Sequence, residues 1–101
     1  MRKLILELER INEAKERAVN AIDIVVGCRC VVVVFSNVTT PKPLVSVVKE
    51  DGQYHGLDFV MDENGVFNID PMQSVSLVEY SGLYDHSSDI CAILTSELGG
   101  V

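Results

Sequence analysis

"LDFVMDENGVFNID", residues 57–70, decides the fold, because it is a strand–turn–strand segment whose register follows from its side-chain pattern. A two-residue loop at Asn64-Gly65 would mix charged and apolar side chains on both faces of the hairpin. A three-residue loop over 63–65, with its glycine in the left-handed conformation of a bulge, makes one face apolar. We therefore predict an antiparallel hairpin with that loop. Its facing pairs are Met61 with Phe67 and Phe59 with Ile69.

The same register places like charges opposite each other on the second face of the hairpin. Asp58 lies opposite Asp70, with Asp62 near the tip. Like charges directly opposed across two strands destabilise a sheet. We therefore expect a compensating cation from the first helix, a second subunit, a divalent metal or a basic partner protein.

Three other segments are predicted to be strands. Residues 28–36, CRCVVVVFS, are apolar on both alternating faces and β-branched, which is typical of a central strand covered on both sides. Residues 44–49, LVSVVK, form the next strand, and Asp51-Gly52 after it predicts a tight turn. Residues 74–80, SVSLVEY, form the last.

Helices are predicted at both ends of the chain. Apolar residues at three- and four-residue steps predict one amphipathic helix from residue 2 to about residue 25, with Gly27 after its end. A second interpretation stays open, in which residues 3–8 form a short strand before a shorter helix. Residues 87–98, SSDICAILTSEL, predict a C-terminal helix with one of the two serines as its N-cap and Gly99 as its end.

These elements predict an α+β domain in the order α-β-β-β-β-β-α. The short connections leave no room for parallel crossovers, so the sheet of about five strands is antiparallel, with a long N-terminal and a shorter C-terminal helix packed on it. A chain of 101 residues, 48% of them hydrophobic, is expected to fold as a single domain over residues 1–101 without a metal or a disulfide.

Cysteine number and hydropathy favour a cytoplasmic protein. Three cysteines are an odd number at spacings that match no secreted disulfide framework. Glu7 and Glu9 interrupt the N-terminal apolar run before it reaches the length of a signal peptide, and no segment approaches a membrane span. We therefore expect no association with a membrane.

The two halves of the chain differ in charge. Residues 1–49 contain all eight Lys and Arg side chains and five acidic ones, whereas residues 50–101 contain ten acidic side chains and no Lys or Arg. Phosphate contacts require cations, so the second half is not expected to bind nucleic acid directly. It is instead suited to a basic surface on another macromolecule.

The sequence contains no recognisable catalytic motif, so we expect a protein that is not an enzyme. Cys28, Cys30, Cys91 and His86 would suit zinc if they met in space, but Cys-x-Cys without a matching second pair is a weak signal. Buried apolar filling is the preferred interpretation of the cysteines. We expect no metal and no cofactor.

We expect a small acidic interaction protein, in its most specific version an inhibitor from a phage or mobile element that imitates the charge of nucleic acid. An amphipathic helix of more than twenty residues in so small a domain also favours a homodimer, because apolar residues beyond the sheet would need a partner. The predicted partner-binding residues are Asp51, Asp58, Asp62, Glu63, Asp70, Glu79 and Asp85.

A second hypothesis is a dimeric protein that binds or sequesters a small molecule at the seam between its subunits. Tyrosines beside predicted turns favour it modestly. The candidate ligand-binding residues are Tyr54, Tyr80, Tyr84 and His86.

Overall fold

The computed structural model describes residues 2–35, 43–50, 56–71 and 82–99, with side chains from Glu9 onward. In order along the chain, its elements are α1 (Arg2–Val26), β1 (Cys30–Phe35), β2 (Leu44–Lys49), β3 (Gly56–Met61), β4 (Phe67–Ile69), the 3-10 turn η1 (Tyr84–His86) and α2 (Ser87–Leu98).

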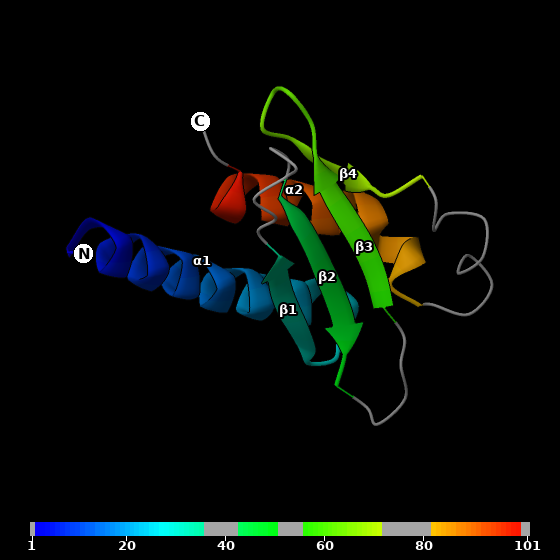
Figure 1. The fold of residues 1–101 in the computed structure, drawn as a ribbon. Helices are drawn as coiled ribbons and strands as arrows, with labels where there is room; N and C mark the ends of the chain where they lie inside the picture. The colour runs from blue at the N-terminus through cyan, green and yellow to red at the C-terminus, as the bar shows by residue number, and fades with distance from the viewer. Residues whose placement is uncertain (1, 36–42, 51–55, 72–81, 100–101) are drawn as a thin grey trace.

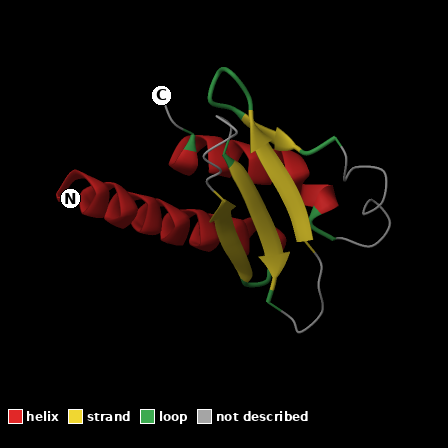
Figure 2. Ribbon diagram, viewed as in Figure 1, coloured by secondary structure: helices red, strands yellow, loops and turns green. Residues whose placement is uncertain are grey.

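The fold is α+β, as the sequence predicts, with both helices on one face of an antiparallel sheet (Figures 1 and 2). The strand order is β1-β2-β3-β4. The described sheet thus has four strands rather than about five. The predicted strand at 74–80 and the predicted turn at Asp51-Gly52 lie outside the described residues.

The β3–β4 hairpin has the predicted register. Phe59 lies opposite Ile69 and Met61 opposite Phe67. Gly65 adopts φ 79°, a left-handed conformation that glycine occupies without the steric cost that a Cβ atom would add. Both phenylalanines are consequently buried against the helices.

Asp62 holds the hairpin loop together through its carboxylate. Oδ1 accepts hydrogen bonds from the backbone N–H groups of Asn64, at 2.8 Å, and Val66, at 3.1 Å. Oδ2 accepts a third from Nδ2 of Asn68, at 3.2 Å. A side chain that the sequence marks as a partner contact therefore also has a local structural function.

The core lies between the inner face of the sheet and the two helices. From α1, small Ala14 and Ala18 face inward with Ile22, and α2 adds Ile90 and Leu94. Alanines allow the two helices to approach closely, and full burial of each larger side chain stabilises the fold by roughly 1.5–3 kcal/mol. The buried side chains that the strands contribute are Cys30, Val32, Val45, Val47, Leu57, Phe59 and Phe67.

Helix α1 is continuous from its first turn, so residues 3–8 are helical and the strand interpretation of that segment is wrong. The helix ends at Gly27, whose φ of 79° allows its N–H to bond the Asp23 carbonyl at 2.8 Å. At 25 residues α1 is about 37 Å long, whereas a six-residue strand spans about 20 Å. The N-terminal turns of α1 therefore extend past the sheet (Figure 1).

Helix α2 begins differently from the prediction. The residue before it is His86, which makes no side-chain capping bond, and Ser87 is already helical. The reason is that η1 runs directly into α2, so that the N–H of Ser87 bonds the Tyr84 carbonyl. A serine cap is not needed there. At the other end the helix stops at Gly99, as predicted.

The interpretation of residues 28–36 as a central strand is wrong for the sheet that the structure describes, because β1 is at one end of the strand order. Its inner face is buried, but Val31 is 43% and Phe35 49% exposed on the outer face. Apolar residues on both faces indicated a doubly covered strand. None of the described helices covers the outer face (Figure 1).

Replacement of Gly99 by alanine is predicted to destabilise the fold. A Cβ atom at this position would lie 2.7 Å from the Gly65 carbonyl oxygen and would also meet the Thr95 carbonyl, so backbone would have to move. We expect the free energy of unfolding to fall by about 1–3 kcal/mol in urea titrations. Ser96→Ala on the exposed side of α2 is the control, with an expected change below about 0.5 kcal/mol. Equal stability of the two variants would contradict this close packing.

Candidate functional site: the groove beside strand β1 and the acidic hairpin

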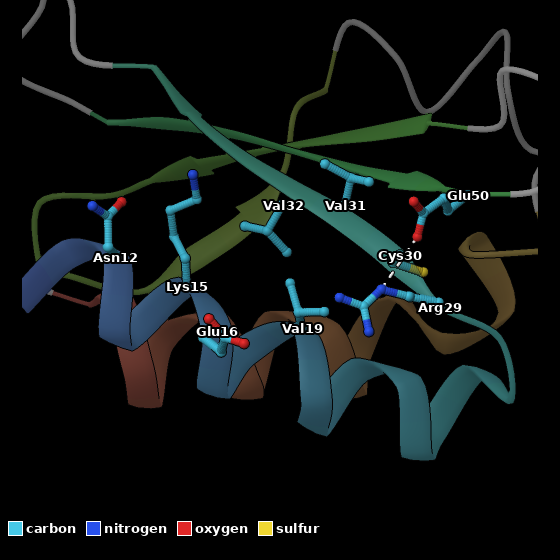
Figure 3. Close-up of a pocket in the computed structure, with 9 residues that line it drawn as sticks. All are labelled: Asn12, Lys15, Glu16, Val19, Arg29, Cys30, Val31, Val32 and Glu50. Atoms are coloured by element: carbon cyan, nitrogen blue, oxygen red, sulfur yellow. Dashed lines mark ion pairs between the residues drawn. The ribbon is translucent and has the colours of Figure 1, made fainter.

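A groove of about 360 Å³ runs between α1 and the outer edge of β1 (Figure 3). Val19 of α1 and Val32 of β1 face each other across its floor, and charged side chains surround them. The remaining lining residues are Asn12, Lys15, Glu16, Arg29, Cys30, Val31 and Glu50.

The charges around this groove are balanced. Arg29 Nε lies 3.2 Å from Glu50 Oε2, with both side chains more than half exposed, so the pair stabilises the fold by no more than about 1 kcal/mol. Lys15 reaches from α1 towards the strand, with Glu16 beside it (Figure 3). Two cations and two anions therefore surround a mostly apolar floor, which does not favour a strongly charged ligand.

The backbone of β1 also faces the groove. Glu50 N–H bonds the Arg29 carbonyl at 3.0 Å, and the register continues with Val31 opposite Val48. In an antiparallel pair, residues whose N–H and C=O groups bond the neighbouring strand alternate with residues whose groups point away from it. The outward groups are those of Cys30, Val32 and Val34. Within the described residues, no strand or side chain bonds them.

The other end of the sheet is covered. The outward N–H of Phe67 in β4 bonds Oγ1 of Thr95 at 3.0 Å, and the outward N–H of Ile69 faces the Cys91 side chain, which partly offsets the rise in its pKa. Thr95 in turn donates to the Cys91 carbonyl at 2.7 Å. Side chains of α2 thus satisfy the edge of β4, which is the usual protection of an edge strand.

Cys30 is placed as a buried filler, not as a nucleophile. Its sulfur lies 3.7 Å from the Cys28 carbonyl oxygen, at the end of the groove. Burial, and secondarily the neighbouring Cys28 thiol, raises the pKa of Cys30 to about 11. The thiol is therefore protonated at neutral pH, and the thiolate is the reactive form.

The cysteines do not assemble with His86 as the zinc hypothesis requires. Cys91 packs beside Ile69 of β4, at the opposite end of the strand order from Cys30, and burial raises the pKa of its thiol. Over residues 2–35, 43–50, 56–71 and 82–99 there is no group of three or more His, Cys, Asp or Glu side chains placed to hold a metal ion.

Asp58 and Asp70 are adjacent, as the hairpin register predicts: the Asp70 N–H bonds the Asp58 carbonyl at 2.9 Å. The Asp58 carboxylate faces Ser46 of β2 and accepts a hydrogen bond from its hydroxyl. A buried serine, rather than a cation, is thus one partner of this carboxylate. The pattern of β2 alone gave no signal for that contact, because it depends on the pairing of β2 with β3.

Two cations of the first half do reach acids of the second. Arg17 of α1 bonds Glu97 of α2 through Nε and Oε2 at 2.8 Å, and Arg29 pairs with Glu50. The first pair joins α1 to α2, and the second joins the residue before β1 to the residue after β2. These two ion pairs neutralise two of the acidic side chains of the second half with cations of the first half.

Other acids remain exposed. Glu63 at the hairpin tip, Asp85 in η1 and Asp89 in the first turn of α2 make no ion pair with any described residue. Asp89 was absent from the predicted contact residues because the sequence indicated only a helix-end function for it. The predicted contacts Asp51 and Glu79 lie outside the described residues.

The residues proposed for a small-molecule site are not gathered at a described groove. Tyr84 packs against the core, and His86 precedes α2. Tyr54 and Tyr80 lie outside the described residues. A groove of about 690 Å³ between β4 and α2 is lined by other side chains, none of them charged.

Comparisons with protein-family models, curated proteins and solved structures gave no match. Among the described helices, none combines the length and the hydropathy needed to cross a membrane.

The raised pKa of Cys30 predicts a loss of stability at alkaline pH. The unfolded chain ionises near pH 9 and the folded one near pH 11, so the contribution of this thiol is complete below pH 9 and is lost as pH rises to 11. In urea titrations between pH 9 and pH 11, the free energy of unfolding of Cys30→Ala should fall by up to about 2–3 kcal/mol less than that of the wild-type protein. An identical pH profile for the wild-type protein and the variant would refute it.

The structural function of Asp62 predicts that Asp62→Ala lowers the free energy of unfolding by about 1–2 kcal/mol, because two backbone N–H groups and one side-chain amide lose their acceptor. Thermal and urea unfolding measure the change. The neighbouring Glu63→Ala is the matched control and should change stability by less than about 0.5 kcal/mol. Destabilisation of similar size in both variants would show that the carboxylate does not hold the loop.

Proposed function

We propose that the chain is a non-catalytic interaction protein that binds a basic surface of another macromolecule through its acidic second half. The observation that carries the proposal is the exposure of Glu63, Asp85 and Asp89 without an ion pair in the described structure. A surface field of one sign attracts an oppositely charged partner and accelerates association.

The hairpin and α2 position these acids on rigid elements. Phe67 bonds Thr95 and Ile69 lies beside Cys91, so β4 runs antiparallel to α2 along its length. The end of β4, with Asp70 after it, is thereby directed towards the first turn of α2, where Asp89 lies. Charges held in a fixed arrangement lose less conformational entropy on binding than charges on a mobile tail.

The absence of Lys and Arg from residue 50 onward distinguishes this surface from an ordinary soluble one, on which both signs are interspersed. The partner that it suits is a protein with a nucleic-acid-binding groove, and inhibition by imitation of nucleic-acid charge is the corresponding activity. We propose a phage or mobile-element context, a cytoplasmic location consistent with three free cysteines, and a homodimer as the working state.

Chemistry at the thiols does not compete with this proposal. Burial raises the pKa values of Cys30 and Cys91, so both are protonated at neutral pH. Neither thiol is therefore poised as a nucleophile.

The proposal predicts that neutralising the unpaired acids weakens partner capture. The immobilised protein is exposed to host lysate at about 50 mM and about 300 mM salt, and retained proteins are quantified by mass spectrometry. Loss of three exposed charge contacts should reduce retention about tenfold at the lower salt concentration. The variant combines Glu63→Gln, Asp85→Asn and Asp89→Asn.

A control with the same change in net charge neutralises three acids of α1 that do not line the groove beside β1. The control variant should retain the same partners as the wild-type protein. Added duplex DNA should displace these partners from the immobilised protein. Retention that persists at the higher salt concentration, or that falls equally in both variants, would contradict the proposal. The control combines Glu9→Gln, Glu13→Gln and Asp23→Asn.

A further inference from the structure

We infer that the outer edge of β1 binds the β1 strand of a second copy of the chain, so that two sheets join about a two-fold axis. The inference deepens the dimer part of the proposed function by naming its interface. It does not use the acidic side chains, so the two proposals can fail separately.

The two ends of the sheet differ in how their outward backbone groups are bonded. At β4, the outward N–H of Phe67 bonds Oγ1 of Thr95, and Cys91 of α2 covers the outward N–H of Ile69. At β1, the N–H and C=O groups of Val32 and Val34 point away from β2 and have no partner among the described residues. A long apolar edge with unpaired backbone groups is a template for another strand.

Helix α1 is long enough to extend beyond the β1 edge of the sheet (Figure 1). Its middle, from Arg10 to Arg17, packs against the C-terminal end of α2, and the turns before Arg10 extend beyond both α2 and β1 (Figure 1). A strand added at the usual spacing of about 4.8 Å would therefore lie above α1 rather than in open solvent. The groove lined by Asn12, Lys15 and Val32 is the space that it would enter (Figure 3).

The chemistry of the groove selects the occupant. Lys15 and Arg29 are balanced by Glu16 and Glu50, so the groove offers no net charge to a charged peptide. The sequence of β1, CVVVVF, is itself uncharged and rich in β-branched residues. Such a strand can place apolar side chains on the apolar part of the groove and bond the outward N–H and C=O groups of β1. A second copy is thus the occupant that the groove fits. The flexible Lys15 side chain can turn aside and donate to a carbonyl of the added strand.

The register follows from the outward groups. A two-fold axis beside Val32 pairs Val32 with its symmetry mate, and Cys30 with Val34 of the second copy, through the free N–H and C=O groups. On the outer face Val31 then meets Val33, and Phe35 meets Arg29. The two apolar side chains that β1 exposes, Val31 and Phe35, both gain a cross-strand neighbour.

Charge substitutions on the outer face of β1 test this register. A variant with Val31→Lys and Val33→Lys places like charges opposite each other in the dimer, while in the monomer both side chains lie on the outer face, Val31 exposed and Val33 half-buried. Sedimentation velocity from about 1 to about 100 µM should show a wild-type dimer and dissociation at least about tenfold easier in the variant. The variant with Val31→Glu and Val33→Glu should dissociate likewise.

A mixture of the lysine and glutamate variants should restore the dimer as a heterodimer, which native mass spectrometry resolves by mass. This rescue excludes misfolding as the cause of dissociation. The control carries Val48→Lys and Val60→Lys, on the same face but on β2 and β3, and should remain dimeric.

Three results would overturn the inference. A wild-type protein that is monomeric throughout the concentration range has no such interface. A lysine variant that stays dimeric would place the interface elsewhere, for example along α1. A control that dissociates as easily as the lysine variant would indicate packing of sheet faces instead of edges.

Discussion

The structure depends on which face of the β3–β4 hairpin points to the helices. Because strand side chains alternate, a shift of one residue would turn Phe59 and Phe67 to the outer face and bring Asp58 inward. Gly65, with its positive φ, and the Asp62 carboxylate hold the three-residue loop that sets the correct register. That loop therefore determines which face of the sheet packs against α2 and where the acidic side chains of the hairpin lie.

The two ends of the sheet show how a small domain handles unpaired backbone. Helix α2 lies close enough to β4 for Thr95 to bond the outward N–H of Phe67 and for Cys91 to cover that of Ile69. Helix α1 crosses below β1 at a distance that leaves a groove, so no equivalent side chain bonds that edge. The difference arises because α1 is tied to α2 by Ala14, Ala18 and the Arg17–Glu97 pair rather than to the strand edge.

Charge is distributed in a comparable way. Cations of the first half pair with Glu50 and Glu97, which lie where the elements of the two halves meet. Ser46 supplies a hydrogen bond, not a charge, to Asp58. The acids on the hairpin tip and at the start of α2 lie away from α1, so the cations of that helix are not their partners. The acidic surface is thus a consequence of where the helices pack.

Local pattern was sufficient for the elements whose partners are close in sequence. The hairpin register, the left-handed Gly65 and the C-terminal ends of both helices follow from period, turn chemistry and glycine position. Their physical cause lies within a few residues, where the sequence displays it. The α+β class follows from the same patterns.

Only the tertiary structure decided the order of the strands and the neighbours across it. The valines of β1 predicted a central strand, because two apolar faces look alike whether or not a helix covers both. The separation of Cys91 from Cys30 and the Ser46–Asp58 contact depend on which strands pair and where the helices pack. The hydrophobic pattern of the sequence indicates which residues are buried, but it does not indicate which surface of the protein buries them.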